Sequence, residues 1–288
     1  MVKCPDPHSG DTVWQYCPSM APAILFAILF GLVSAAHLVK AYVYRKSFCV
    51  VIVGAAMWET VGFILRIFSI LYPDGLGLYI PHQMLIILAP LWINAFVYMT
   101  VGRMMYFYMP EQKILGLRAE RLTICFVFLD FVALAIQSGG GSSLSQGDEK
   151  SRQIGIDVYM VGVGLQQLFV LMFFFVTYQF QHKACRMDTG RSTNWKPLLC
   201  AVYAVLNLIT TRIVYRIIEF ANGVWDYVPT HEAFFYCLDA LPMFAALCVF
   251  LVWHPGKYLV GPDSEFPKRN GIWGRRKNDS TALQEDTV

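Results

Sequence analysis

The chain has 288 residues, of which 56% are hydrophobic and 15% charged, and its formal net charge is only +3. Soluble domains carry about 25% charged residues, so this composition argues against a soluble domain, and the chain shows no nucleic-acid-binding signature. The apolar residues also come in long blocks, and about 20 such residues in a helix cross a hydrocarbon layer about 30 Å thick.

Seven apolar blocks follow one another along the chain. Lipid offers the backbone no hydrogen-bonding partner, so only helices and closed β-barrels span it. The blocks lack the two-residue alternation of barrel strands, so we predict an all-α integral membrane protein built as a bundle of seven transmembrane helices. The predicted helices are Ala21–Val43, Phe48–Leu71, Ile80–Met104, Leu122–Ile136, Ile156–Gln179, Pro197–Ile218 and Ala233–Trp253.

Lys and Arg residues between the blocks predict the orientation, because cytoplasmic loops carry an excess of them. Sixteen lie in the first, third and fifth loops and the C-terminal tail, against three on the opposite side. We therefore predict an extracellular N-terminal tail (1–20), a membrane domain (21–257) and a disordered cytoplasmic tail (258–288). The sixteen are Arg45, Lys46, Arg103, Lys113, Arg118, Arg121, Lys183, Arg186, Arg191, Lys196, Lys257, Lys268, Arg269, Arg275, Arg276 and Lys277, and the three are Lys3, Lys150 and Arg152.

Two features stand out on the predicted external side. The segment Ser138–Arg152 is rich in Gly and Ser and predicts a flexible loop. Cys4 and Cys17 fall in the N-terminal tail, where an oxidising compartment permits a disulfide, although two free thiols fit the sequence equally well. The eight cysteines show no metal-ligand spacing, so we expect neither a metal site nor a cofactor.

Ionisable residues inside the predicted helices are the most informative feature of the sequence. Each costs about 2.5–3.5 kcal/mol at the centre of a helix, so together they must face one another or water. The seven are Glu59, Arg66, Asp130, Arg212, Arg216, Glu219 and Asp239, and with four carboxylates and three arginines their charges sum to −1.

Their spacing places these residues on common helix faces. Arg212, Arg216 and Glu219 follow an i, i+4, i+7 pattern, which makes a single stripe. With Gln83, Gln137 and Gln166 they predict a polar cavity that opens toward the outer leaflet and binds substrate. The alternative is that the arginine–carboxylate pairs only fix the helix register. The candidate substrate-binding residues are Glu59, Arg66, Gln83, Asp130, Gln137, Gln166, Arg212, Arg216, Glu219 and Asp239.

Two prolines, Pro90 and Pro242, fall inside the third and seventh helices, where each removes a helical hydrogen bond and predicts a bend. The chain has no GxxxxGK[ST] phosphate loop, no HExxH metal motif and no GxSxG nucleophile motif. The sequence therefore gives no reason to expect an enzyme.

Several short motifs, taken together in this order, resemble those of the fungal lipid-translocating exporters, a family of RTA-like seven-helix proteins that includes the 7-aminocholesterol-resistance proteins and the sphingoid long-chain-base exporter. The resemblance covers roughly Tyr16 to Lys257. The matching positions are Tyr16–Ser19, Glu59–Gly62 with Arg66, Ala89–Pro90 through Tyr98, Gly102–Arg103, Asp130 through Gln137–Gly141, Gly162–Gln166, Arg212–Arg216 with Glu219, Glu232, Asp239–Met243 and His254–Gly256.

This resemblance implies a protein of the plasma membrane, or of another endomembrane, that moves lipids or confers resistance to lipid-like toxic compounds. A lipid with an amine head, such as a sphingoid base, would place that amine beside Asp239 or Glu219. The expected partners are membrane lipids or lipid-like small molecules, and no protein partner is indicated. One alternative is a seven-helix lipid receptor or sensor that transports nothing, and another is an intramembrane lipid enzyme.

Overall fold

The computed structural model describes residues 14, 16–73, 75–109, 112–114, 116–143, 149–186, 195–221 and 227–259. Six long helices come first, and the seventh span is assembled from three consecutive helical pieces. The long helices are α1 (Met20–Tyr44), α2 (Cys49–Leu71), α3 (Leu76–Tyr108), α4 (Ala119–Ser143), α5 (Glu149–Arg186) and α6 (Trp195–Ala221), and the pieces are α8 (Glu232–Phe235), the π-helix η1 (Tyr236–Ala240) and α9 (Leu241–Val252).

Seven of these helical segments are long and apolar enough to cross a membrane, which confirms the predicted number of spans and makes this a multi-pass membrane protein. The remaining described elements are short: α7 (Tyr227–Thr230), α10 (Pro255–Tyr258), and an antiparallel pair of two-residue strands, β1 (Lys113–Ile114) and β2 (Leu117–Arg118). The strand pair was not predicted, and its turn contains Gly116 at a φ of 79°, which glycine adopts without strain.

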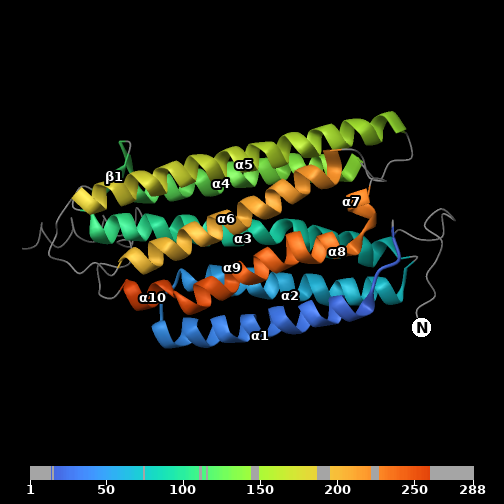
Figure 1. Cartoon of the computed structure of the whole chain (residues 1–288), viewed down its shortest axis with the longest axis horizontal. Coiled ribbons are helices and arrows are strands. Elements are labelled where there is room, and N and C mark those ends of the chain that lie inside the picture. The colour runs from blue at the N-terminus through green and yellow to red at the C-terminus, as the bar shows by residue number, and fades with distance from the viewer. Residues whose placement is uncertain are drawn as a thin grey trace, which may run out of the picture.

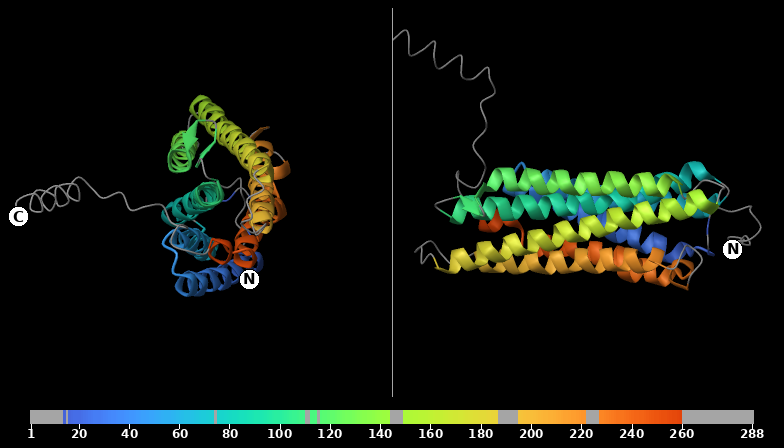
Figure 2. Two further views of the ribbon diagram at one scale, coloured as in Figure 1. Left: turned by 90° about the vertical axis from the view of Figure 1, so that its left-hand side faces the viewer. Right: turned by 90° about the horizontal axis from the view of Figure 1, so that it is seen from above.

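The spans lie side by side with their axes roughly parallel (Figure 1). Each long helix packs against the next one in the chain, and α9 packs against both α6 and α1, which closes a ring. Helix α3 also contacts α5, α6 and α9, and the end-on view in Figure 2 shows it between α2 and α4, opposite α6. We call the end at which α1 begins and α6 ends the N-terminal end of the bundle.

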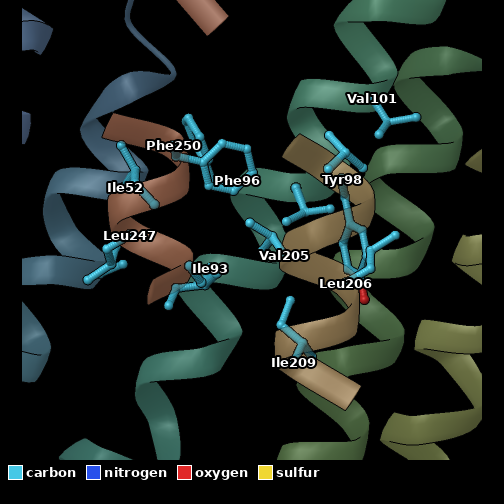
Figure 3. Packing of buried hydrophobic residues seen from close by; sticks show 14 of the residues in the cluster. Ile52, Ile93, Phe96, Tyr98, Val101, Val205, Leu206, Ile209, Leu247 and Phe250 are labelled. Carbon is cyan, nitrogen blue, oxygen red and sulfur yellow. The ribbon is translucent and has the colours of Figure 1, made fainter. Parts of the chain in front are cut away.

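The interior is filled by large apolar side chains. Ile52, Ile93, Phe96 and Phe250 meet between α2, α3 and α9, and each is fully buried (Figure 3). Many large apolar residues also lie on the outer surface, where Phe128 is 63% exposed. Such a surface suits lipid, and because lipid is as apolar as the core, close packing of small residues has to hold the helices together.

Glycine provides this close packing between α4 and α5. A Cβ atom on Gly162 would lie 2.7 Å from Cγ of Gln137, and one on Gly140 would lie 2.5 Å from the backbone nitrogen of Tyr159. Neither position has room for a side chain, so the two backbones approach each other closely.

The prediction of a flexible loop over Ser138–Arg152 is therefore wrong for most of that segment. Helix α4 runs to Ser143 and α5 begins at Glu149. Glycines in a polar segment are typical of a flexible loop, but here Gly140 packs α4 against α5. For a related reason α3 and α5 are longer than predicted, at 33 and 38 residues, because hydropathy marks only the apolar part of a helix.

The two prolines have different local effects. Helix α3 continues through Pro90, whose missing N–H leaves the carbonyl of Ile86 without its helical donor. Near Pro242 the chain forms the π-helix η1, in which the N–H of Leu241 donates to the carbonyl of Tyr236, five residues earlier. The wider turn accommodates the proline and changes the direction in which the side chains just before it point.

Two predictions about the tails concern residues outside the described part of the chain. The C-terminal tail beyond Leu259 is one of them. Cys17 is disulfide-bonded, which agrees with a bridge in the N-terminal segment, while Cys4, its predicted partner, lies outside the described residues. The side of the membrane that each end of the bundle faces stays a prediction.

Candidate functional site

Two arginines of α6 share one carboxylate. Arg212 and Arg216 are one turn apart on the same face of the helix. Nε of Arg212 donates to Oδ1 of Asp239, and Nη2 of Arg216 donates to Oδ2 of the same residue. Asp239, which is 1% exposed, is carried by the π-helix η1. The expectation that the buried charges face one another is thus confirmed for these three residues, and both oxygens of this carboxylate are occupied.

Each of the two arginines has a further partner besides Asp239. Nη1 of Arg216 donates to Oε2 of Glu219 at 2.8 Å, and the hydroxyl of Tyr215 donates to Oε1 of Glu219 at 2.9 Å. Nη2 of Arg212 donates to the backbone carbonyl of Ile86 at 2.8 Å. This carbonyl is the one that Pro90 leaves without a helical donor, so a proline on α3 provides an acceptor for an arginine on α6.

Glu59 on α2 completes this group with an extra negative charge. It is 2% exposed, and it interacts electrostatically with Arg212, Arg216 and Asp239. Among the hydrogen bonds and ion pairs of the described residues, none involves its carboxylate. We call Glu59, Arg212, Arg216, Glu219 and Asp239 the arginine network; with two arginines and three carboxylates, it holds one more carboxylate than cation.

A small cavity borders the arginine network inside the bundle. It lies between α3, α4, α5 and α6, and its volume of about 10 Å³ is close to the minimum that holds one water molecule. On its wall, Nε2 of Gln137 donates to Oε1 of Gln166 at 2.9 Å. The lining residues are Ile87, Gln137, Tyr159, Val163, Gln166, Arg212, Ile213 and Arg216.

Arg66 belongs to a second cluster, at the N-terminal end of the bundle. Its Nη2 donates to Oε1 of Glu232 at 2.9 Å and to the hydroxyl of Tyr16 at 2.8 Å, and its Nε donates to the hydroxyl of Tyr236 at 3.1 Å. The guanidinium also lies 4.4 Å from the ring centroid of Phe235. Arg66 is thus held by several partners at once and is absent from the cavity wall.

The segment before α1 folds over this second cluster. Trp14 is buried and donates from Nε1 to the carbonyl of Ser69 at 3.3 Å. The backbone N–H of Ser19 donates to Oε2 of Glu232 at 2.7 Å. Burial raises the pKa of Tyr16, although the positive charge of Arg66 lowers it, so the phenol keeps its proton. The segment therefore joins the start of the chain to the start of the last span.

Asp130 lies in a third place, between α4 and α3. Its Oδ2 accepts a hydrogen bond from Nδ2 of Asn94 at 2.8 Å and another from the hydroxyl of Tyr98 at 2.8 Å. Gln83, on α3, is half-buried and takes part in none of the side-chain hydrogen bonds of the described residues. The candidate residues thus divide among the arginine network with its cavity, the Arg66 cluster and Asp130, with Gln83 apart from all three.

Several tyrosines with a place in these clusters were not among the predicted site residues. Tyr159 lines the cavity, Tyr215 holds Glu219, and Tyr98 holds Asp130. The sequence spacing could have identified Tyr215 and Tyr98. Tyr215 lies four residues before Glu219, and Tyr98 lies four residues after Asn94, so each pair shares one helix face. Tyr16 carried no such signal, because its contact with Arg66 joins a tail to a distant helix.

Comparison with known proteins gives a consistent set of similarities. The family model described as "RTA1 like protein" matches residues 51–261. The probable lipid transporter atnI of Emericella nidulans is 36% identical over 276 residues, which cover 91% of this chain and 72% of that protein. Protoporphyrin uptake protein 1 of Saccharomyces cerevisiae is 27% identical over 283 residues, covering 85% of this chain and 92% of that protein.

A further relative is the sphingoid long-chain base transporter RSB1 of Saccharomyces cerevisiae, which is 22% identical over 301 residues, covering 90% of this chain and 78% of that protein. No solved structure matches the chain. The family model covers the chain from the start of α2 to the end of the last span, a range that includes both arginines and Asp239.

Proposed function

We propose that this chain, which belongs to the RTA1-like family, transports an amphipathic lipid across the membrane, with the polar head of the lipid passing along the wall that Gln137, Gln166 and Arg216 form. The observation that carries this proposal is a buried polar cavity, bordered by the arginine network, inside a bundle whose outer surface is apolar. Polar groups at such depth are costly and commonly mark the path of a substrate.

The charge of the arginine network favours a cationic head group. Asp239 and Glu219 have both oxygens occupied by donors from α6. Glu59 supplies the excess carboxylate, and a protonated amine on the substrate would balance it. The names of two relatives, a probable lipid transporter and a sphingoid long-chain base transporter, support a sphingoid base as the first substrate to test, and resistance to lipid-like toxic compounds would follow from the same activity.

The cavity must enlarge during transport. Its present volume suits one water molecule, whereas an amine head group with its attached chain is several times larger. The described structure is therefore a closed state, in which the pairing of Arg212 and Arg216 with Asp239 holds α6 against η1. A lipid head could enter once those helices separate from α4 and α5.

The orientation and location belong to the same proposal. The N-terminal end of the bundle would face the outside and the C-terminal tail the cytoplasm, which is supported by the excess of Lys and Arg in the opposite loops and by the disulfide at Cys17. The plasma membrane is the proposed site, with an endomembrane as the alternative. The Arg66 cluster and the segment from Trp14 to Ser19 would then close the outer end.

The test is lipid flux by the purified full-length protein in liposomes. Fluorescent analogues of a sphingoid base, a zwitterionic phospholipid and an uncharged ceramide are placed in one leaflet, and their appearance in the other leaflet is timed. We expect faster movement of the sphingoid base than in protein-free liposomes. Binding of the same lipid by folded protein without any flux would overturn the proposal and favour a receptor or sensor.

A further inference from the structure

Asp130 is a buried carboxyl group whose hydrogen bonding is incomplete. It is 1% exposed, as is Asn94. Oδ2 of Asp130 accepts two hydrogen bonds, from Asn94 and Tyr98, whereas Oδ1 of Asp130 and Oδ1 of Asn94 are buried without any partner. Two acceptor oxygens of one small cluster therefore lack a donor, which is uncommon in a buried polar group.

Among the ion pairs of the described residues, none involves Asp130. From α3 it meets Asn94 and Tyr98, both neutral, which donate hydrogen bonds to it. From α5 the nearby side chain is Phe173, whose ring centroid lies 4.4 Å from that of Tyr98 and 5.1 Å from that of Phe126 on α4. Asp130 thus differs from Asp239, which two arginines neutralise.

A proton satisfies this arrangement better than a metal ion does. A proton on Oδ1 of Asp130 neutralises the carboxylate, so that no unpaired charge remains inside the membrane. It also turns Oδ1 from an acceptor that lacks a donor into a hydroxyl that can itself donate. A metal ion such as Ca²⁺ takes six to eight oxygen ligands, and Mg²⁺ demands six. The cluster offers two unpaired oxygens, and the rings of Phe126 and Phe173 pack against Tyr98.

We propose that Asp130, with Asn94 and Tyr98, forms a proton-binding site in the middle of the membrane, and that its protonation and deprotonation couple one proton to each transport cycle. Asp130 lies two turns from Gln137 on one face of α4, and Gln137 lines the cavity. The helix that carries the proton thus also forms part of the proposed lipid path. The coupling rests on the proposed function, whereas proton binding by Asp130 does not.

Proton binding is tested by infrared difference spectroscopy of the full-length protein in lipid nanodiscs between low and high pH. We expect a protonated-carboxyl band in the wild type that is absent from Asp130→Asn and kept in Asp157→Asn, a matched change of an exposed carboxylate on α5. If Asp130→Asn does not fold, Asp130→Glu should move the frequency of the band. An unchanged band in whichever of these variants folds would overturn the proposal.

Coupling is tested by steady-state accumulation, in liposomes with a pH gradient, of a sphingoid base whose amine is trimethylated, because its fixed charge prevents the redistribution that a pH gradient imposes on any weak base. One proton per lipid corresponds to about a tenfold accumulation per pH unit, and we expect this in the wild type and in Asp157→Asn. Asp130→Asn should accumulate nothing yet still equilibrate the lipid between leaflets. Accumulation that follows a sodium gradient, or that persists in Asp130→Asn, would overturn the coupling. Absence of flux in every protein, with the infrared band intact, would instead reject the transport proposal.

Discussion

The backbone carbonyl of Ile86 accepts a hydrogen bond from Nη2 of Arg212 at 2.8 Å. In an uninterrupted helix this carbonyl would bond to the N–H of the residue four positions later, which here is Pro90. The proline thus frees an acceptor at the depth where a buried guanidinium needs one, and it links α3 to α6 without any side chain of α3 taking part.

Pro90→Ala should therefore reduce transport while leaving the protein folded. The new N–H competes with Arg212 for the carbonyl of Ile86, and an alanine is about 3 kcal/mol more favourable than a proline inside a helix. We expect equal or higher thermal stability and a several-fold lower flux in liposomes. The matched control is Pro81→Ala in the first turns of the same helix, and an equal loss of flux in both variants would contradict this role of Pro90.

Asp239→Asn should destabilise the protein strongly. Removing the charge of Asp239 breaks two buried ion pairs and leaves Arg212 without a directly bonded carboxylate, at a cost of about 3–5 kcal/mol. Thermal unfolding in nanodiscs measures this, with Asp157→Asn, an exposed carboxylate, expected to stay within about 0.5 kcal/mol of the wild type. Unchanged stability in Asp239→Asn would mean that the two ion pairs contribute little to the fold.

Glu59→Gln should behave differently from Asp239→Asn, because no hydrogen bond among those of the described residues depends on the Glu59 carboxylate. We expect nearly unchanged thermal stability and about a tenfold weaker apparent affinity for the cationic sphingoid base, which corresponds to about 1.4 kcal/mol. The transport of an uncharged lipid should not change. Equal losses for charged and uncharged lipids would exclude Glu59 as the partner of the amine.

The sequence predicted the spans well because a run of about twenty apolar residues is the length that a helix needs to cross the hydrocarbon layer. It also predicted that buried arginines and carboxylates face one another, because helical periodicity puts the two arginines of α6 on one face and burial demands a counter-charge, and Arg212, Arg216 and Asp239 do so. It could not separate Arg66 from that group, since the contacts of Arg66 with Tyr16 and Glu232 join residues 50 and 166 positions away. Periodicity within one helix carries no information about which helices meet.

Gly162→Ala should weaken the packing between α4 and α5. The added Cβ would lie 2.9 Å from the backbone nitrogen of Gln137 and 3.0 Å from the carbonyl oxygen of Ala133, so backbone must move, at a typical cost of about 1–3 kcal/mol. Gly164→Ala, two residues later, meets nothing within 4 Å and should be neutral or stabilising. Thermal unfolding of the two variants compares them directly, and equal stability would show that the helices separate easily at Gly162.

The proposed orientation can be tested in intact cells. A protease site fused after Val288 should be protected from protease added outside, and one inserted between α4 and α5 should be cut. The expectation follows from the excess of Lys and Arg on the opposite side. The reverse pattern of cleavage would invert the bundle and place the Arg66 cluster at the cytoplasmic face.

The ribosome makes the two arginines of α6 before it makes the carboxylate that joins them. Asp239 follows Arg216 by 23 residues and Arg212 by 27, so α6 emerges with two arginines and a single acidic partner, Glu219. Each arginine in the centre of an isolated helix opposes insertion by about 2.5–3.5 kcal/mol. We therefore expect the last two spans to enter the bilayer together, because Asp239 on η1 supplies the carboxylate that both arginines share.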